Sequence, residues 1–463
     1  MKAGRCASTL AACACLAGCA TFHPLPLDDA RGPVRITEVS VRAASLPLPA
    51  LREYPFDPGN GLDVTEVAML AVANNPKLKV ERDKADVAQA QAYAAGLLPD
   101  PQVSYSRDYP TGNQPDTTVA FTEGLSLDLG NLVTRSARVA AARAGEREVD
   151  LNLLWSEWQA IADARTLFDR VYFQRRLVAR LERERSALAP VQRAVTRALK
   201  SGDLTYQVAA TGLNAASDVA NQLADAKRQL GLAERDLHDL LGLDLAVSLD
   251  LAGAPFSVDP GTGEVQRALA DMTRRRPDLL ALQAGYHSQN EKLREAILAQ
   301  FPAITIGFNR ARDNSNIRST GFTIGLSLPL FDGNRGHIAI ERATRQQLHD
   351  EYSARLLADR NDVQRLAADL ASGRKQRAAL VSHAKELAHA REAASTNYAA
   401  GRLDWPTYLA IRANSLAADT TLLKLKASTH ETAIALDALV GNWPAASLAK
   451  KSDSESMRPH EKQ

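Results

Sequence analysis

Apolar residues recur with two different spacings along this chain, and the two spacings occupy alternating blocks. Within residues 132–199, leucines and valines repeat every seven residues, with others four residues into the same frame: Leu167, Val171, Val178, Leu181, Leu188 and Val195. This spacing is typical of a coiled-coil seam and predicts one very long helix. Ser201-Gly202-Asp203 ends this helix, and a second helix is predicted over residues 204–241.

Shorter segments alternate between apolar and small or polar residues, which is the spacing of a β-strand. They span residues 102–109, 117–129, 303–312 and 320–330. Phe322, Ile324 and Leu326 fall on one face, with threonine, glycine and serine between them. Strands of about ten residues with this pattern suit a membrane barrel with a wet lumen, and equally a half-buried soluble sheet. Four strands from one chain cannot close a barrel, so insertion into lipid requires several chains.

The order helix, strand, strand, helix, helix occurs twice. Four pairs of short segments match at an offset of about 200 residues: Asn75-Pro76-Lys77-Leu78 with Arg276-Pro277-Asp278-Leu279, Leu125-Ser126-Leu127 with Leu326-Ser327-Leu328, Ser201-Gly202-Asp203-Leu204 with Ala400-Gly401-Arg402-Leu403, and Leu241-Gly242 with Val440-Gly441. A period this long indicates duplication of a whole domain rather than a solenoid. We therefore expect a mainly α chain with repeats over residues 61–250 and 251–445, whose long helices, 132–199 and 335–399, extend roughly 100 Å each.

The amino terminus has the features of a secretory signal peptide over residues 1–18. Lys2 and Arg5 precede an apolar run that ends in Leu16-Ala17-Gly18-Cys19. This ending resembles the lipobox of bacterial lipoproteins and implies cleavage before Cys19 and acylation of its thiol. A plain signal peptide with an incidental cysteine is the alternative. Residues 19–60 are Pro-rich and predicted to be extended, and residues 446–463 form a polar tail predicted to be disordered.

Composition and charge exclude several classes of function. The chain carries 56 Lys and Arg against 54 Asp and Glu without a basic stripe, so no nucleic-acid partner is expected. After the signal peptide there is no run of about 18 apolar residues, so no transmembrane helix is predicted. Histidines are scattered and no nucleophile, phosphate-binding or zinc motif occurs, so we predict no enzyme activity and no metal site. Apart from covalent lipid on Cys19, no cofactor is expected.

Several motifs in this order resemble the TolC family of outer-membrane efflux proteins, over about residues 60–442. They are Asn75-Pro76-x-Leu78, Leu97-Leu98-Pro99-x-Pro101, Arg276-Pro277-Asp278-Leu279 and Pro329-Leu330-Phe331-Asp332-Gly333-Asn334-Arg335-Gly336. The last of these is the most specific. The lipobox and the last motif look most like the efflux ducts of the family, especially its heavy-metal branch.

The resemblance implies a homotrimer in the outer membrane. Each chain would give four strands to one shared twelve-strand β-barrel, and its helices to an α-barrel tunnel through the periplasm. The trimer would be the passive exit duct of a tripartite efflux pump. An inner-membrane RND-type transporter would supply the energy, and a periplasmic membrane-fusion adaptor would join it to the duct. The alternatives are the exit duct of a type I protein secretion system and a lipid-anchored periplasmic coiled-coil scaffold.

The turns at Gly202 and Gly401 correspond to the periplasmic tips of that family. The residues that would contact the adaptor are Ser201, Gly202, Asp203, Leu204, Ala400, Gly401, Arg402 and Leu403. Asp203, Arg402 and Asp404 are the candidate polar groups around the narrow end of the duct. An ordinary solvated turn is the alternative interpretation of each.

Overall fold

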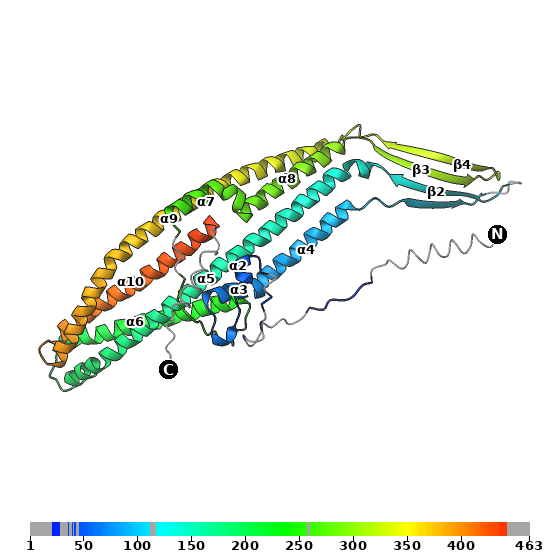
Figure 1. The fold of residues 1–463 in the computed structure, drawn as a ribbon. Helices are drawn as coiled ribbons and strands as arrows, with labels where there is room; N and C mark the ends of the chain where they lie inside the picture. Colours follow the sequence, from blue (N-terminus) through cyan, green and yellow to red (C-terminus); the bar gives the residue numbers. More distant parts are fainter. Residues whose placement is uncertain are drawn as a thin grey trace, which may run out of the picture.

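The chain folds into a long, gently bent rod of helices with a β-sheet at one end (Figure 1). The computed structural model describes residues 21–27, 36, 39, 41, 42, 46–111, 117–256 and 260–441. The predicted signal peptide, Cys19 and the tail at 446–463 lie outside these residues. Within the part that is described, no helix is long and apolar enough to cross a membrane.

The predicted duplication is present as two successive sets of elements. The first set is α3 (Val64–Asn74), α4 (Pro76–Gly96), β1 (Gln102–Asp108), β2 (Ala120–Asp128), α5 (Gly130–Lys200) and α6 (Tyr206–Leu241). The second set is α7 (Thr262–Arg275), α8 (Pro277–Leu298), β3 (Ala303–Arg312), β4 (Arg318–Ser327), α9 (Arg335–Ala399) and α10 (Trp405–Val440). The predicted fold class, mainly α with four strands in a duplicated order, is confirmed.

Local sequence explains where the first helices begin. Asp63 accepts hydrogen bonds from the N–H groups of Thr65 and Glu66, while the Glu66 carboxylate accepts from the Asp63 N–H, so α3 starts with a capping box. Asn75 then caps α4 through the Lys77 N–H, at 2.8 Å, with Pro76 in the first turn. This Asn-Pro pair separates α3 from α4.

The four strands form one antiparallel sheet in the order β1-β2-β3-β4. The register places Leu125 opposite Phe308, and Phe308 opposite Phe322, so the apolar residues line up on one face. Small and polar residues such as Ser126 and Gly307 share the other face. Strands β1 and β4 each have one neighbour among the described residues, which leaves the sheet with two open edges.

Strand bounds differ from the sequence prediction at a few ends. β2 begins at Ala120 rather than at 117, because Asp108, the last residue of β1, pairs with Ala120 and the N–H of Thr118 donates instead to the Asn314 carbonyl. β4 ends at Ser327 rather than at 330, shortly before Pro329, which has no N–H for the ladder.

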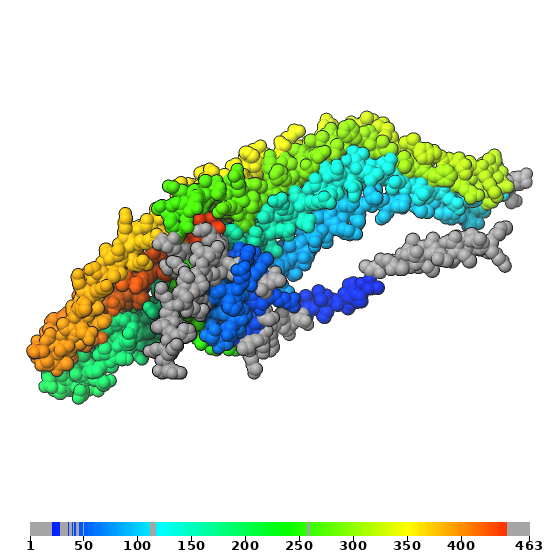
Figure 2. Space-filling view, in the orientation of Figure 1, coloured from blue at the N-terminus to red at the C-terminus, as the bar shows by residue number. Residues whose placement is uncertain are grey.

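The stretch directly before α3 is not simply extended, and that prediction is wrong for residues 46–60. It contains the short helix α2 (Pro49–Arg52) and the 3-10 turn Pro58–Asn60. Leu46 and Leu51 are buried in the cluster that joins α3, α5 and α6 near the middle of the rod. Figure 2 shows the part of this segment next to α3, in blue, lying against the middle of the rod. Burial of these leucines stabilises a folded conformation of the segment, which its high proline content did not predict.

Candidate functional site: the helical tips and the ion-pair network above them

The turn between α5 and α6 lies at the end of the rod opposite the sheet (Figure 1). Gly202 has φ of +81°, a left-handed conformation that glycine adopts without strain. The N–H groups of Asp203 and Leu204 both donate to the Ala198 carbonyl, at 2.9 and 3.1 Å. The Ser201 hydroxyl donates to the Asp203 carboxylate at 2.5 Å. These bonds close the end of α5 and hold the turn tightly.

The turn between α9 and α10 repeats this design at the same end. Gly401 has φ of +68°, and its N–H donates to the Tyr398 carbonyl at 3.0 Å. The Arg402 N–H donates to the Asn397 carbonyl at 2.8 Å. Asp404 caps α10 by accepting from the Thr407 N–H at 3.3 Å. Both turns therefore present short, well-ordered tips.

The two tips share a division between exposed polar residues and inward leucines. Asp203, Arg402 and Asp404 are exposed. Leu204 and Leu403 pack instead against one apolar cluster that includes residues of α5, α6, α9 and α10. Among the residues that the structure describes, no ion pair joins the three charged tip residues to one another. Within one chain, the predicted polar groups of the narrow end do not form a charge cluster.

A buried ion-pair network does lie above the tips, and sequence reasoning missed it. Glu184 of α5 accepts from Arg412 Nε of α10 at 2.7 Å and from Arg180 Nη1 at 2.8 Å. Asp419 of α10 accepts from Arg180 Nε at 2.8 Å and from Arg391 Nη1 of α9 at 3.2 Å. The network thus connects the α5–α6 hairpin to the α9–α10 hairpin.

Hydrogen bonds decide the charge of Glu184. Its side chain is 2% exposed, and this burial raises the pKa, but the bonds from Arg412 and Arg180 outweigh burial and hold the pKa below its ordinary value. Arg412 Nη1 also donates to the Tyr408 hydroxyl at 3.0 Å, and the Tyr408 ring stacks on Tyr398 of α9 at 4.4 Å. The charged form of the network is therefore the stable one.

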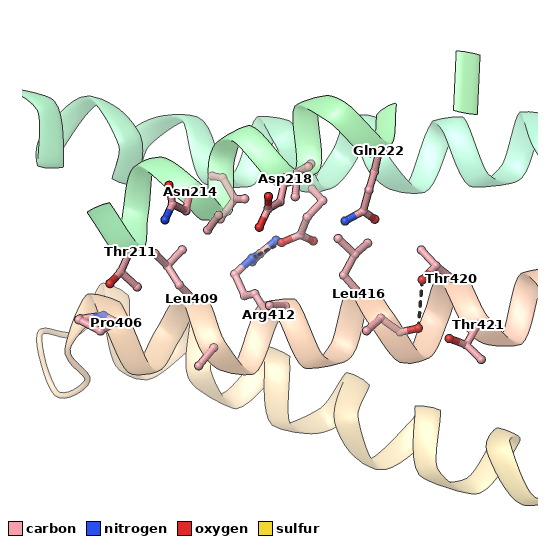
Figure 3. A pocket seen from close by; sticks show the side chains of 17 residues that line it. Thr211, Asn214, Asp218, Gln222, Pro406, Leu409, Arg412, Leu416, Thr420 and Thr421 are labelled. Atoms are coloured by element: carbon pink, nitrogen blue, oxygen red, sulfur yellow. Dashed lines mark hydrogen bonds and ion pairs between the residues drawn. The ribbon is translucent and has the colours of Figure 1, made fainter. Parts of the chain in front are cut away.

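A groove of about 550 Å³ opens over this network between α6 and α10 (Figure 3). Polar residues of α6 line one side: Thr211, Asn214, Asp218 and Gln222. The α10 side is lined by Pro406, Leu409, Arg412, Leu416, Thr420 and Thr421. In Figure 3, the Arg412 side chain rises from α10 between Leu409 and Leu416. The hairpins are thus joined by ion pairs between α5 and α10, while the groove separates α6 from α10 along part of their length.

A second buried cluster joins α5 to α10 nearer the middle of the rod. Arg165 Nη1 lies 3.5 Å from Asp437, and His430 Nδ1 lies 3.2 Å from Asp169. Burial, opposed by Arg165, raises the pKa of Asp437 to about 6. Burial likewise raises the pKa of Asp169. No group of three or more metal-ligating side chains occurs among the described residues, here or elsewhere.

Comparison with known proteins identifies the architecture. Residues 268–442 match the family model described as outer membrane efflux protein. The multidrug resistance outer membrane protein MdtQ of Escherichia coli O157:H7 is 24% identical over 354 residues, which covers 66% of this chain and 70% of MdtQ. The chain therefore resembles the TolC-like outer-membrane efflux proteins, in its second repeat by sequence and in its fold as a whole. Its location is the outer membrane, and the matching family consists of channels.

Solved outer-membrane channels share the fold of this chain. CusC superposes with a TM-score of 0.68 at 19% identity, covering 86% of this chain and 97% of CusC. The CmeC outer membrane channel of Campylobacter jejuni gives a TM-score of 0.67 at 15% identity, covering 95% and 98%. The similarity extends beyond the part matched by the family model and includes the sheet and both helical hairpins.

One sequence signal for the missed network was available. Glu184 lies three residues after Leu181 and four before Leu188, so it falls on the same face of α5 as these seam leucines. A carboxylate at such a position indicates a buried partner. Its partner Arg412 is 228 residues away, and nothing in the sequence pairs the two. The chain therefore carries this network beside the seam, where sequence spacing alone predicted apolar packing.

Proposed function

We propose that three copies of this chain close one barrel and form the passive exit duct of a tripartite efflux pump. The observation that supports this proposal most directly is the sheet: four strands with one apolar face and open edges at β1 and β4. Open edges are not tolerated in the hydrocarbon core of a membrane. Pairing β4 of one chain with β1 of the next removes all the edges, and three chains then give the twelve-strand barrel that the family resemblance implies.

The partners follow from the shape. The tips at Gly202 and Gly401 lie at the end of the rod farthest from the sheet, and so project into the periplasm (Figure 1). There they contact a periplasmic membrane-fusion adaptor through Ser201, Asp203, Arg402 and their neighbours, by packing of helical hairpins. The adaptor joins the duct to an inner-membrane RND-type transporter. The duct itself carries out no catalysis, and its one covalent group is lipid on Cys19.

We infer that the Glu184–Arg412 network keeps the periplasmic end closed at rest. It lies about 27 Å above the Gly202 turn, at 1.5 Å per residue. It also joins the two hairpins that must separate if the narrow end widens. In planar bilayers, Arg412→Gln trimers are expected to show a higher resting conductance than wild type. Arg228→Gln, which removes an exposed ion pair with Asp225, is the matched control. Equal conductance in all three proteins would contradict the inference.

A gene deletion tests the transport function. We expect the deletion strain to become sensitive to exported small molecules, and the intact gene to restore resistance. Two panels separate the cargo classes: mono- and divalent metal cations, and lipophilic drugs, dyes and detergents. Sensitivity to one panel alone assigns the cargo. Unchanged growth in both panels, together with loss of a secreted protein, would favour the exit duct of a type I secretion system instead.

A further inference from the structure

The apolar face of the sheet ends in a band of arginines at the tip farthest from the helices. Going toward the tip, the register gives apolar rows at Ile304 and Leu326, then Ile306 and Ile324, then Phe308 and Phe322. The next row holds Arg310, and the last row holds the pair Arg312 and Arg318. On the first hairpin, Arg107 pairs with Phe121, which pairs with Arg312, so Arg107 belongs to the last row as well.

These arginines share the face that carries the apolar residues, because side chains two residues apart on a strand point to the same side. Arg107, Arg310 and Arg318 are exposed. Arg312 is more enclosed: its Nη2 donates to the Val119 carbonyl at 2.9 Å and its guanidinium lies 5.2 Å from the Phe121 ring centre. The opposite, small-residue face of the four strands carries no arginine or lysine.

The band carries more positive than negative charge. On this face of the described strands, Glu123 is the one carboxylate against four arginines, and it lies directly across the strand from Arg310. Arg312 and Arg318 are direct cross-strand partners, where like charges repel. An anion held between the rows relieves this repulsion, and a guanidinium binds phosphate oxygens through paired N–H donors.

The position of the band points to a lipid. The tip with the β3–β4 turn lies opposite the helices and therefore faces outward, and the apolar rows beneath it face the hydrocarbon core. A barrel in a membrane has an apolar band about 25 Å tall, flanked by headgroups. One amphipathic molecule in the outer leaflet then contacts both regions: its acyl chains meet the phenylalanines and isoleucines, and its phosphates meet the arginines. Free phosphate uses only the second region.

We propose that Arg107, Arg310 and Arg318 bind the phosphates of a phosphorylated glycolipid in the outer leaflet of the outer membrane. This site rests on the proposed insertion of the sheet into the membrane. It is separate from the transport path, because it lies on the outer face of the barrel. Three chains give three such sites around the rim.

The test measures binding of lipid A to the purified trimer in a neutral detergent by native mass spectrometry. Bisphosphorylated lipid A is compared with its dephosphorylated form, which has the same acyl chains, and with phosphatidylcholine. We expect wild type to bind the bisphosphorylated form about tenfold more tightly or better, because its two phosphates accept charge-assisted hydrogen bonds from the arginines that the dephosphorylated form cannot accept. Equal affinity for the two forms of lipid A would overturn the proposal. So would inhibition of binding by inorganic phosphate at concentrations near those of the lipid.

Variants assign the effect to these residues. Arg310→Gln with Arg318→Gln is expected to abolish the preference for phosphate, whereas Arg310→Lys with Arg318→Lys retains most of it, because the charge remains. An unchanged preference in the glutamine variant also overturns the proposal. The comparison of the two lipid forms on wild type needs no variant, so poor folding of a variant leaves a decisive result. If wild type shows no preference but still forms a membrane trimer that restores export, the lipid site fails and the duct stands.

Discussion

At the scale of single residues, buried charge is concentrated where the two halves of the chain meet. Glu184 is held by two arginines from different helices, and Arg165 lies between Asp437 and Asp169. Each cluster links α5 of the first half to α10 of the second. Long coiled coils slide and splay easily when only leucines join them. Directional pairs fix one relative position of the hairpins.

Removing one member of the upper network should destabilise the helical region strongly. Arg412→Leu leaves the Glu184 carboxylate buried with a single partner, and a loss of about 3 kcal/mol or more is expected. Glu184→Leu combined with Arg412→Leu should cost much less, because no unpaired charge remains. A double-mutant cycle on thermal unfolding of the detergent-solubilised protein measures this coupling. Additive effects of the two substitutions would show that the pair is not coupled.

Asp437 should make stability depend on pH. Burial raises its pKa from 3.8 to about 6, so the folded state takes up a proton before the unfolded chain does as the pH falls. Its contribution to stability is complete below about pH 4 and is lost as the pH rises through about 6. When the pH is lowered from 7.5 to 4, the free energy of unfolding of wild type should therefore rise by up to about 3 kcal/mol relative to that of Asp437→Asn. Unfolding midpoints of both proteins across that range measure the gain, and parallel curves would refute it.

The residues that carry the network also show where sequence reasoning stops. The turn glycines at 202 and 401 could be read directly, because a helix break needs a residue that tolerates positive φ. Glu184 and Arg412 could not be paired, because their contact depends on how two hairpins pack, and packing leaves no fixed spacing in the sequence. The arginine band was missed for a similar reason. It becomes visible only when the strand register aligns Arg107, Arg312 and Arg318.

At the scale of elements, the fold is organised by the breaks between helices. Gly202 and Gly242 both end helices of the first half with positive φ, at +81° and +61°. Their surroundings differ. A Cβ on Gly202 would meet nothing within 4 Å, whereas a Cβ on Gly242 would lie 2.6 Å from the Asn74 carbonyl oxygen and 2.9 Å from Pro76 Cδ. Gly242 is therefore fixed by packing against the α3–α4 junction as well as by its conformation.

This contrast predicts different costs for the same substitution. Gly202→Ala should lower the free energy of unfolding by about 1 kcal/mol, the cost of an alanine in the left-handed conformation. Gly242→Ala should lower it considerably more, because backbone atoms must also move apart. Unfolding midpoints and the yield of membrane-inserted protein compare the two variants. Equal losses of stability would mean that the α3–α4 junction at Asn74 moves to accommodate the added methyl group without destabilising the fold.

Elements with clear boundaries were predicted well, and those that depend on tertiary contacts were not. The long helices α5 and α9 follow the predicted ranges closely, since their seams and terminal glycines are local signals. Helix α2 has only four residues and is stabilised by burial of Leu51 against distant elements. No local periodicity can reveal so short a helix, and the proline content favoured an extended chain instead.

At the scale of the whole molecule, lipid on Cys19 and the barrel would anchor the same protein twice. The anchor should therefore matter for delivery more than for transport. Cys19→Ala is expected to reduce the amount of trimer in the outer membrane, while each inserted trimer keeps wild-type conductance. Membrane fractionation measures the amount, and bilayer recordings measure the conductance. Correctly inserted Cys19→Ala trimers that conduct nothing would contradict this expectation.

The open edges at β1 and β4 have a genetic consequence. Because each chain completes its neighbours, a defective copy damages the assemblies it joins rather than only itself. If variant and wild-type chains are made equally and mix freely, about one trimer in eight contains no variant chain. Alleles that fold and pair but block the tunnel should therefore be dominant over wild type. Alleles that fail to form the sheet should be recessive, because they never enter the ring.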